Sequence, residues 1–203
     1  MSIQKMYEDI INKKYEDINI IKNEILNQWG VDNFDIDIIF DEIIRDQNGN
    51  RAFGGFYKDE NIIKINSTEI ISFVGLKICH DNLIELGIEN CKKVFEYYFF
   101  YILAHELHHA YLYNRSKEEY IKIKEEDRGK DYKESNLEIY ADNYAMQYLE
   151  SISIKAKKVG ELAINLRCGS YKQFKLEGEL DEECRNRFIV QELKKIINWI
   201  FNI

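Results

Sequence analysis

The chain has 203 residues, of which 45% are apolar and 32% charged, with no proline and a formal net charge of −8. This length and composition exclude a disordered or fibrous chain, and they allow a single domain with a sizeable core. The net negative charge argues against a protein whose main task is to bind nucleic acid, so no direct nucleic-acid binding is expected.

The sequence shows no segment that would enter a membrane. The longest wholly apolar run, Tyr97–Ala104, is far shorter than the ~20 residues that a bilayer-spanning helix needs. The N-terminus is charged throughout and lacks the unbroken apolar core of a signal peptide. We therefore expect a cytoplasmic protein. Its four widely spaced cysteines form no Cys-x-x-Cys pair and are interpreted as reduced thiols: Cys79, Cys91, Cys168 and Cys184.

Three short strands are predicted in the N-terminal half. Apolar residues alternate over 34–40, and the Asn48-Gly49 pair that follows is a strong two-residue turn signal. Further strands are expected at 51–57 and 61–66, on either side of a polar turn. Together they predict an antiparallel meander. The paired glycines Gly54-Gly55 indicate a bulge or a close approach of another backbone.

The remainder of the chain is predicted to be mostly helical. Apolar residues three or four apart over the first 28 residues predict one helix, with Ser2 as a possible N-cap and Gly30 as its C-terminal stop. The charged stretch 117–133 is interpreted as a solvated loop or short helix. Further helices are expected at 90–114, at 135–151 and from Asp181 onward. We expect a single domain over 1–203, with a core at about 30–155 and a helical C-terminal extension at about 156–203.

The predicted central helix carries the pattern His-Glu-x-x-His. His105 and His109 are four residues apart, so on a helix they project from one face and can bind a single ion. Glu106 lies to one side of them, where it can hold a water molecule without binding the metal itself. His108 lies to the other side, where a structural role is favoured over a catalytic one.

A third ligand is expected from the next predicted helix. Zinc in a hydrolytic site takes three protein ligands and keeps one position open for water. Glu138 and Asp142 are one helical turn apart and share a face, and the small side chains of Ala141 and Ala145 allow close packing there. We predict Glu138 as the third ligand and Asp142 as the hydrogen-bond acceptor for a ligating imidazole, that of His105.

The competing choices for this ligand are Glu134 and Glu150, neither of which has the same small-residue context. With either choice the pattern predicts one Zn²⁺ per chain.

These residues resemble the ImmA/IrrE-like zinc metallopeptidases, part of the gluzincin group. The shared features are His105–His109, the run Glu138–Ala145, and the segment Gly55-Phe56-Tyr57 followed by Ile63–Asn66. The resemblance covers roughly 30–155. It implies an α+β, zincin-like fold, in which a small antiparallel three-stranded sheet packs on a buried metal-bearing helix.

The resemblance also implies a bacterial cytosolic protease that cleaves an intracellular regulatory protein, often a repressor. The chain departs from the family in the long stretch Glu69–Lys93 and in the segment beyond Tyr148. Phage-exclusion peptidases of the Lit type, which act on a host protein, look similar around the same motifs and are the alternative.

The predicted reaction is peptide-bond hydrolysis at a zinc ion held by His105, His109 and Glu138. Glu106 would take the proton of the attacking water and pass it to the departing amine. An extended protein or peptide substrate would add as a strand to the exposed sheet edge. The residues expected at that edge are Gly54, Gly55, Phe56 and Tyr57.

Two other classes of protein fit the same motifs. One is a non-catalytic binding or antitoxin-like module in which zinc only joins two helices. A closed site of that kind needs a fourth protein ligand, and it has no use for Glu106. The other is an amidase or another zinc hydrolase with a non-protein substrate, because the ligands do not identify the bond that is cleaved. The group that stabilises the oxyanion is not assigned from the sequence.

Overall fold

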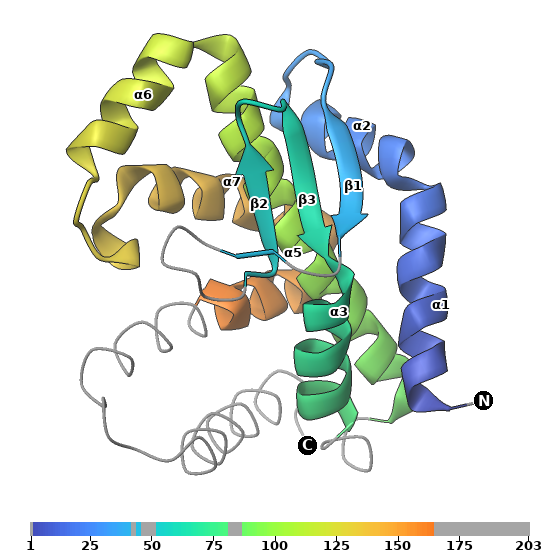
Figure 1. Ribbon diagram of the computed structural model, residues 1–203. Helices are drawn as coiled ribbons and strands as arrows, with labels where there is room; N and C mark the ends of the chain where they lie inside the picture. The colour runs from blue at the N-terminus through green and yellow to red at the C-terminus, as the bar shows by residue number, and fades with distance from the viewer. Residues whose placement is uncertain (1, 42–43, 46–51, 81–86, 165–203) are drawn as a thin grey trace.

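The computed structural model describes the chain except residues 1, 42–43, 46–51, 81–86 and 165–203. The described part is α+β, mostly helical, with one small sheet (Figure 1). In chain order its elements are α1 (Ile3–Glu16), α2 (Ile18–Trp29), β1 (Asp37–Asp41), β2 (Gly54–Tyr57), β3 (Ile62–Asn66), α3 (Ser67–Glu69), the π-helix η1 (Ile70–His80), α5 (Ile88–Arg115), α6 (Lys117–Glu126), the 3₁₀-helix η2 (Tyr132–Glu134) and α7 (Asn136–Ile152). Residues 154–164 are also helical.

The N-terminal segment forms two helices where one was predicted. Ser2 caps α1, since its hydroxyl accepts a hydrogen bond from the Lys5 amide, and Gly30 ends α2 in the left-handed conformation at φ +68°. The break falls at Asp17, whose backbone leaves the helical region and whose carboxylate binds the ammonium of Lys13 at 3.2 Å. Aspartate favours helix ends because its short side chain competes for local hydrogen bonds.

The sheet is mixed, and the predicted antiparallel meander is wrong for its first strand. The strand order is β1-β3-β2, in which β2 pairs antiparallel and β1 pairs parallel with β3. The third strand takes the centre because Ile63 and Ile65 are fully buried, and the glycine-rich β2 takes an edge. The β2–β3 hairpin matches the prediction, whereas Asn48-Gly49 lies outside the described residues.

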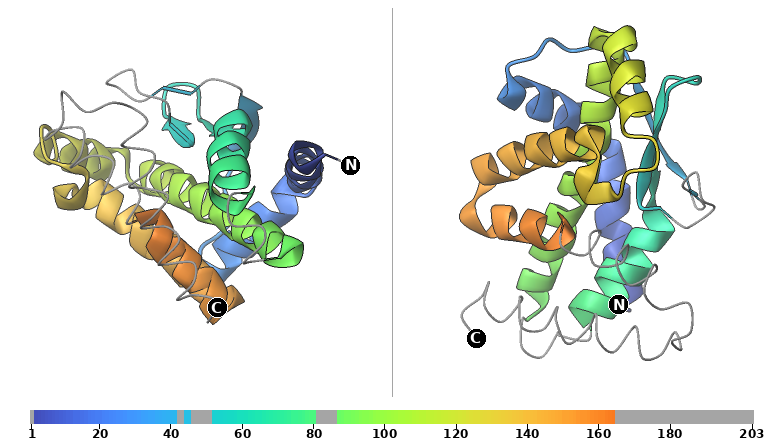
Figure 2. Two further views of the ribbon diagram at one scale, coloured as in Figure 1. Left: turned by 90° about the horizontal axis from the view of Figure 1, so that it is seen from below. Right: turned by 90° about the vertical axis from the view of Figure 1, so that its left-hand side faces the viewer.

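Helix α5 lies between the sheet on one side and α7 on the other (Figure 2). Every residue from Tyr101 to Ala110 is buried, in agreement with the prediction of a central helix that is apolar on nearly all sides. Ile102 and Glu106 of α5 pack on β2, while α7 crosses the opposite face of the helix. The predicted metal-ligand motif therefore lies in a fully buried part of α5.

A helical segment that the sequence analysis did not predict connects β3 to the region before α5. It consists of α3 and the π-helix η1. Gly75 of η1 lies directly against the ring of Tyr7, so close that a Cβ at this position would be 2.7 Å from the ring atom Cδ2. The glycine therefore allows η1 to pack on α1.

The charged stretch after α5 forms α6 and then a connection to α7, so it is partly helical. The helix predicted from Asp181 onward lies outside the described residues. In the part of the chain that the structure describes, no helix has the length and apolar character needed to cross a bilayer.

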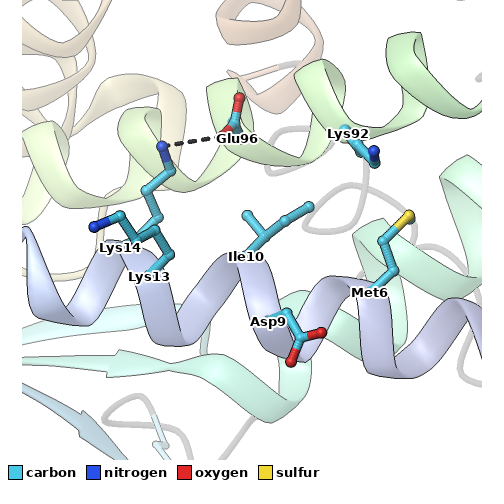
Figure 3. A pocket seen from close by; sticks show the side chains of 7 residues that line it. All are labelled: Met6, Asp9, Ile10, Lys13, Lys14, Lys92 and Glu96. Carbon is cyan, nitrogen blue, oxygen red and sulfur yellow. Dashed lines mark ion pairs between the residues drawn. The ribbon is translucent and has the colours of Figure 1, made fainter. Parts of the chain in front are cut away.

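A shallow hollow between α1 and α5 is lined by Met6 and Ile10 together with charged side chains (Figure 3). Lys14 crosses it to pair with Glu96 at 3.0 Å, and its ammonium also lies 4.9 Å from the centre of the Phe100 ring. The charged groups of this hollow thus join the two helices.

Candidate metal centre

Three side chains from two helices converge at one point. His105 and His109 lie on one face of α5, and Glu138 reaches them from the first turn of α7. The two Nε2 atoms are 3.1 Å apart. The Glu138 carboxylate lies 3.1 Å from the His105 Nε2 through Oε2 and 3.7 Å from the His109 Nε2 through Oε1. The triad thus results from the four-residue spacing of the two histidines on α5 and from one contact between α5 and α7.

The position of Glu138 follows from the way α7 begins. Ser135 is the N-cap, and its hydroxyl accepts a hydrogen bond from the Glu138 amide. The carboxylate therefore lies in the first helical turn, where the unpaired amides and the helix dipole favour negative charge. The buried Ala141 and Ala145 face α5 on the same helix and allow the two helices to approach closely, as predicted.

The competing acidic residues lie outside this group. Glu134 is exposed in η2, and Glu150 is exposed and pairs with Lys157 at 2.7 Å. Among the described residues, His105, His109 and Glu138 form the one cluster whose ligand atoms all lie within 4.8 Å of one another.

The electrostatics of the triad favour a proton or a metal ion between its acceptor atoms. His105 Nδ1 lies 2.9 Å from Asp142 Oδ1, so this nitrogen carries the ring proton and its N–H donates a hydrogen bond to the carboxylate. In the neutral ring, Nε2 then has only a lone pair, and it faces the carboxylate oxygen of Glu138. Burial works to raise the pKa of Glu138, but the imidazoles of His109 and His105 hold this pKa well below its ordinary value. Two acceptors at 3.1 Å repel unless a further proton or a metal ion lies between them.

The geometry of the triad fits a metal ion. In a tetrahedral zinc site with bonds of about 2.0–2.1 Å, neighbouring ligand atoms are about 3.3 Å apart. The three separations here, 3.1, 3.1 and 3.7 Å, lie close to that length. Two imidazole nitrogens and a carboxylate are also a ligand set that divalent transition metals accept. These residues could therefore hold a divalent ion.

Asp142 accepts hydrogen bonds from two tyrosines in addition to the predicted bond from His105. Its Oδ1 also accepts hydrogen bonds from the hydroxyls of Tyr101 at 2.5 Å and of Tyr132 at 2.9 Å. Neither tyrosine is among the residues predicted from the sequence. Tyr101 lies four residues before His105, so the helical spacing could have indicated it, whereas no sequence signal places Tyr132 here.

Glu106 lies beside the triad but is not part of it. Its side chain is buried against Gly54 of β2, where a Cβ on the glycine would lie 3.0 Å from Glu106 Cγ and 3.3 Å from Oε1. No residue of the described chain donates a hydrogen bond to this carboxylate, so its lone pairs are available to a water molecule. The paired glycines predict a bulge or the close approach of another backbone, but the close neighbours of Gly54 are side chains of the motif-bearing helix.

The four residues predicted at the sheet edge fall into two pairs. The Asn66 amide donates a hydrogen bond to the Phe53 carbonyl, and in an antiparallel hairpin hydrogen-bonded residue pairs alternate with pairs that are not hydrogen-bonded. Gly55 and Tyr57 are therefore the residues of β2 that exchange backbone hydrogen bonds with β3. The backbone groups of Gly54 and Phe56 therefore point away from β3, toward the edge.

An aromatic wall flanks the site on the α6 side. Phe56 packs against Tyr113 and Tyr120, with ring centres 5.5 and 6.2 Å away. Burial, together with the negative charges of Glu106 and Glu138, raises the pKa of Tyr120, so this phenol stays protonated.

His108 is directed away from the triad, into an aromatic cluster. Its ring centre lies 4.3 Å from that of Tyr144 and 6.3 Å from those of Trp29 and Tyr111. Burial, reinforced by the nearby His109 and His105, lowers the pKa of His108 to about 3, so the ring is neutral. These contacts agree with the structural role expected for this residue.

Comparisons with protein-family models, with curated proteins and with solved structures gave no match to this chain.

Proposed function

We propose that this protein is a zinc-dependent metallopeptidase that hydrolyses a peptide bond at the His105–His109–Glu138 triad. The observation that carries the proposal is the convergence of these three ligands beside Glu106, a buried carboxylate that does not belong to the ligand cluster. A site that only stabilised the fold would not need such a group. The resemblance to the ImmA/IrrE-like family supports the same reaction class.

The proposed mechanism assigns a task to each side chain. When bound, zinc would supply Lewis acidity, which polarises the scissile carbonyl and lowers the pKa of a coordinated water. Glu106 takes a proton from the attacking water and passes it to the departing amine. The Asp142 carboxylate keeps the proton of His105 on Nδ1, which leaves Nε2 free to bind the metal.

The substrate is proposed to be an extended segment of a protein or peptide. Strand β2 is an edge strand, and the backbone groups of Gly54 and Phe56 face outward, beside Glu106. An added strand would hydrogen-bond to these two residues, and its own backbone would then run past the triad. Gly55 and Tyr57 would support this edge from within the sheet. The intracellular regulatory protein implied by the family resemblance is our proposed substrate class.

The alternative of a structural zinc site has less support. A closed structural site uses four protein ligands, usually cysteine or histidine. The ligand cluster in the described part of the chain has three members, and none is a cysteine. Three protein ligands with a nearby carboxylate are the arrangement of a hydrolytic site.

The test uses the purified full-length chain loaded with zinc, with Glu106→Gln as the matched variant. Both proteins are incubated with a peptide library prepared from a bacterial proteome, and new N-termini are identified by mass spectrometry. We expect equal zinc content in both proteins and new N-termini only with the wild type. Zinc binding without any cleavage would instead favour the structural site, and equal cleavage by both proteins would remove Glu106 from the mechanism.

A further inference from the structure

We propose that Tyr132 is a positioning residue of the metal centre, which orients the ligand His105 by fixing the carboxylate of Asp142. The inference rests on the proposed metal site, but it does not depend on which bond the protein cleaves. It assigns a role to the connection between α6 and α7, which contributes no ligand of its own.

The contact that carries the inference is at a single oxygen atom. Asp142 Oδ1 accepts hydrogen bonds from the Tyr132 hydroxyl at 2.9 Å and from the Tyr101 hydroxyl at 2.5 Å, and it lies 2.9 Å from His105 Nδ1. A carboxylate can rotate about its terminal torsion, and that rotation is broad when few donors restrain it. Three donors on one oxygen fix its direction, and the fixed oxygen then sets the plane of the imidazole.

The three donors come from two parts of the fold. Tyr101 and His105 are both on α5, so the Tyr101 bond alone ties Asp142 to the helix that already carries the ligand. Tyr132 reaches the same oxygen from η2, on the connection between α6 and α7. Its ring also lies nearly parallel to that of His105, at 14° with centres 6.5 Å apart. Tyr132 therefore restrains the carboxylate from a second element, and its ring lies alongside the ligand ring.

The connection that carries Tyr132 is itself held in place. The buried Asp127 at the end of α6 accepts hydrogen bonds from Lys130 Nζ at 2.8 Å, from Ser135 Oγ at 3.0 Å and from the Leu137 amide at 2.9 Å. These bonds span the connection from the last turn of α6 to the first turn of α7. The hydrogen bonds to Asp127 thus fix the segment that places the Tyr132 hydroxyl beside Asp142.

Removal of this hydroxyl should weaken metal binding. Loss of a group that orients a metal ligand typically reduces metal affinity by about 10- to 100-fold. Because Tyr101 still binds the same oxygen, we expect the lower end of this range, about tenfold, for Tyr132→Phe. This substitution keeps the ring and its packing against His105 and removes only the hydroxyl.

The test measures the zinc dissociation constant by competition with a chelator for the wild type, Tyr132→Phe and Tyr140→Phe. Tyr140 is the matched control, since it lies on α7 one residue past Ile139, is 46% exposed and makes no hydrogen bond within the described chain. We expect about tenfold weaker binding for Tyr132→Phe and no change for Tyr140→Phe. Equal affinities for all three proteins would overturn the inference.

A second readout separates positioning from a general loss of stability. In the Co²⁺-substituted protein, the exchangeable Nδ1 proton of His105 should give a paramagnetically shifted NMR signal, because it is held by Asp142. We expect this signal to move or exchange faster in Tyr132→Phe and to stay unchanged in Tyr140→Phe. An unmoved signal, with weaker binding matched by weaker folding of the metal-free protein, would assign Tyr132 a structural role only. A wild type that binds no zinc would refute the proposed function as well.

Discussion

Gly54 marks the place where β2 meets the motif-bearing helix, and its replacement by alanine is a sharp test of this packing. An added Cβ would lie 2.9 Å from Ile102 Cγ2, closer than real Cβ contacts allow, and 3.0 Å from Glu106 Cγ, closer than most of them. Ile102 is fully buried and cannot move aside without disturbing the core. Overpacking of this kind costs about 1–3 kcal/mol, so the Gly54→Ala variant should lose about that much free energy of unfolding.

The control is the neighbouring glycine. A Cβ at Gly55 would lie 3.3 Å from the ring edge of Tyr57, a half-buried side chain that can turn aside, and at an ordinary contact distance of 3.8 Å from Ile44 Cγ2. Urea unfolding of the zinc-free proteins should show Gly54→Ala destabilised by about 1–3 kcal/mol and Gly55→Ala changed by less than about 0.5 kcal/mol. Zinc affinity should stay unchanged in both, because neither touches a ligand. Equal stabilities of the two variants would refute the described packing of β2 on α5.

Three further predictions concern Asp127, Gly30 and metal removal. Burial alone would raise the pKa of Asp127, but hydrogen bonds from Lys130 and Leu137 hold this pKa below the ordinary 3.8. The ionised carboxylate therefore stabilises the fold at neutral pH, and this contribution is lost as the pH falls through the folded-state pKa. Asp127→Asn should cost about 1–3 kcal/mol at neutral pH, and its difference from the wild type should shrink in urea titrations at acid pH. Gly30→Ala should cost about 1 kcal/mol in the same assay through left-handed strain alone, since no atom lies within 4 Å of the added carbon; an unchanged stability would contradict the C-cap. Free zinc at 100 times the dissociation constant of the wild type should raise the free energy of unfolding of the wild type by about 2.7 kcal/mol, and a chelator should abolish this gain. A Glu138→Gln variant that gained as much at the same zinc concentration would contradict the triad.

The metal ligands could be predicted because their geometry is mostly local. The spacing of His105 and His109 places both on one face of any helix, and the pair Glu138 and Asp142 does the same on the next helix. One contact between helices, allowed by small side chains, then completes the group. The helix ends at Ser2 and Gly30 could be predicted for the same reason, since each depends on one residue and its neighbours in sequence.

Other features depend on tertiary structure and carry no local signal. An alternating apolar pattern is the same whether a strand pairs parallel or antiparallel, so the direction of β1 beside β3 could not be inferred. Tyr132 reaches Asp142 only because of the path of the chain between α6 and α7. The π-helix η1 arises where Gly75 packs against Tyr7, which is a contact between segments nearly seventy residues apart in sequence.

The central claim is that α5 and α7 hold one divalent ion between His105, His109 and Glu138. The most direct measurement is an anomalous difference map from crystals grown with zinc, with data collected at the zinc absorption edge. The account predicts one peak per chain, about 2 Å from the two Nε2 atoms and from a carboxylate oxygen of Glu138. A map with no peak at this position, or with zinc bound by other side chains, would contradict it.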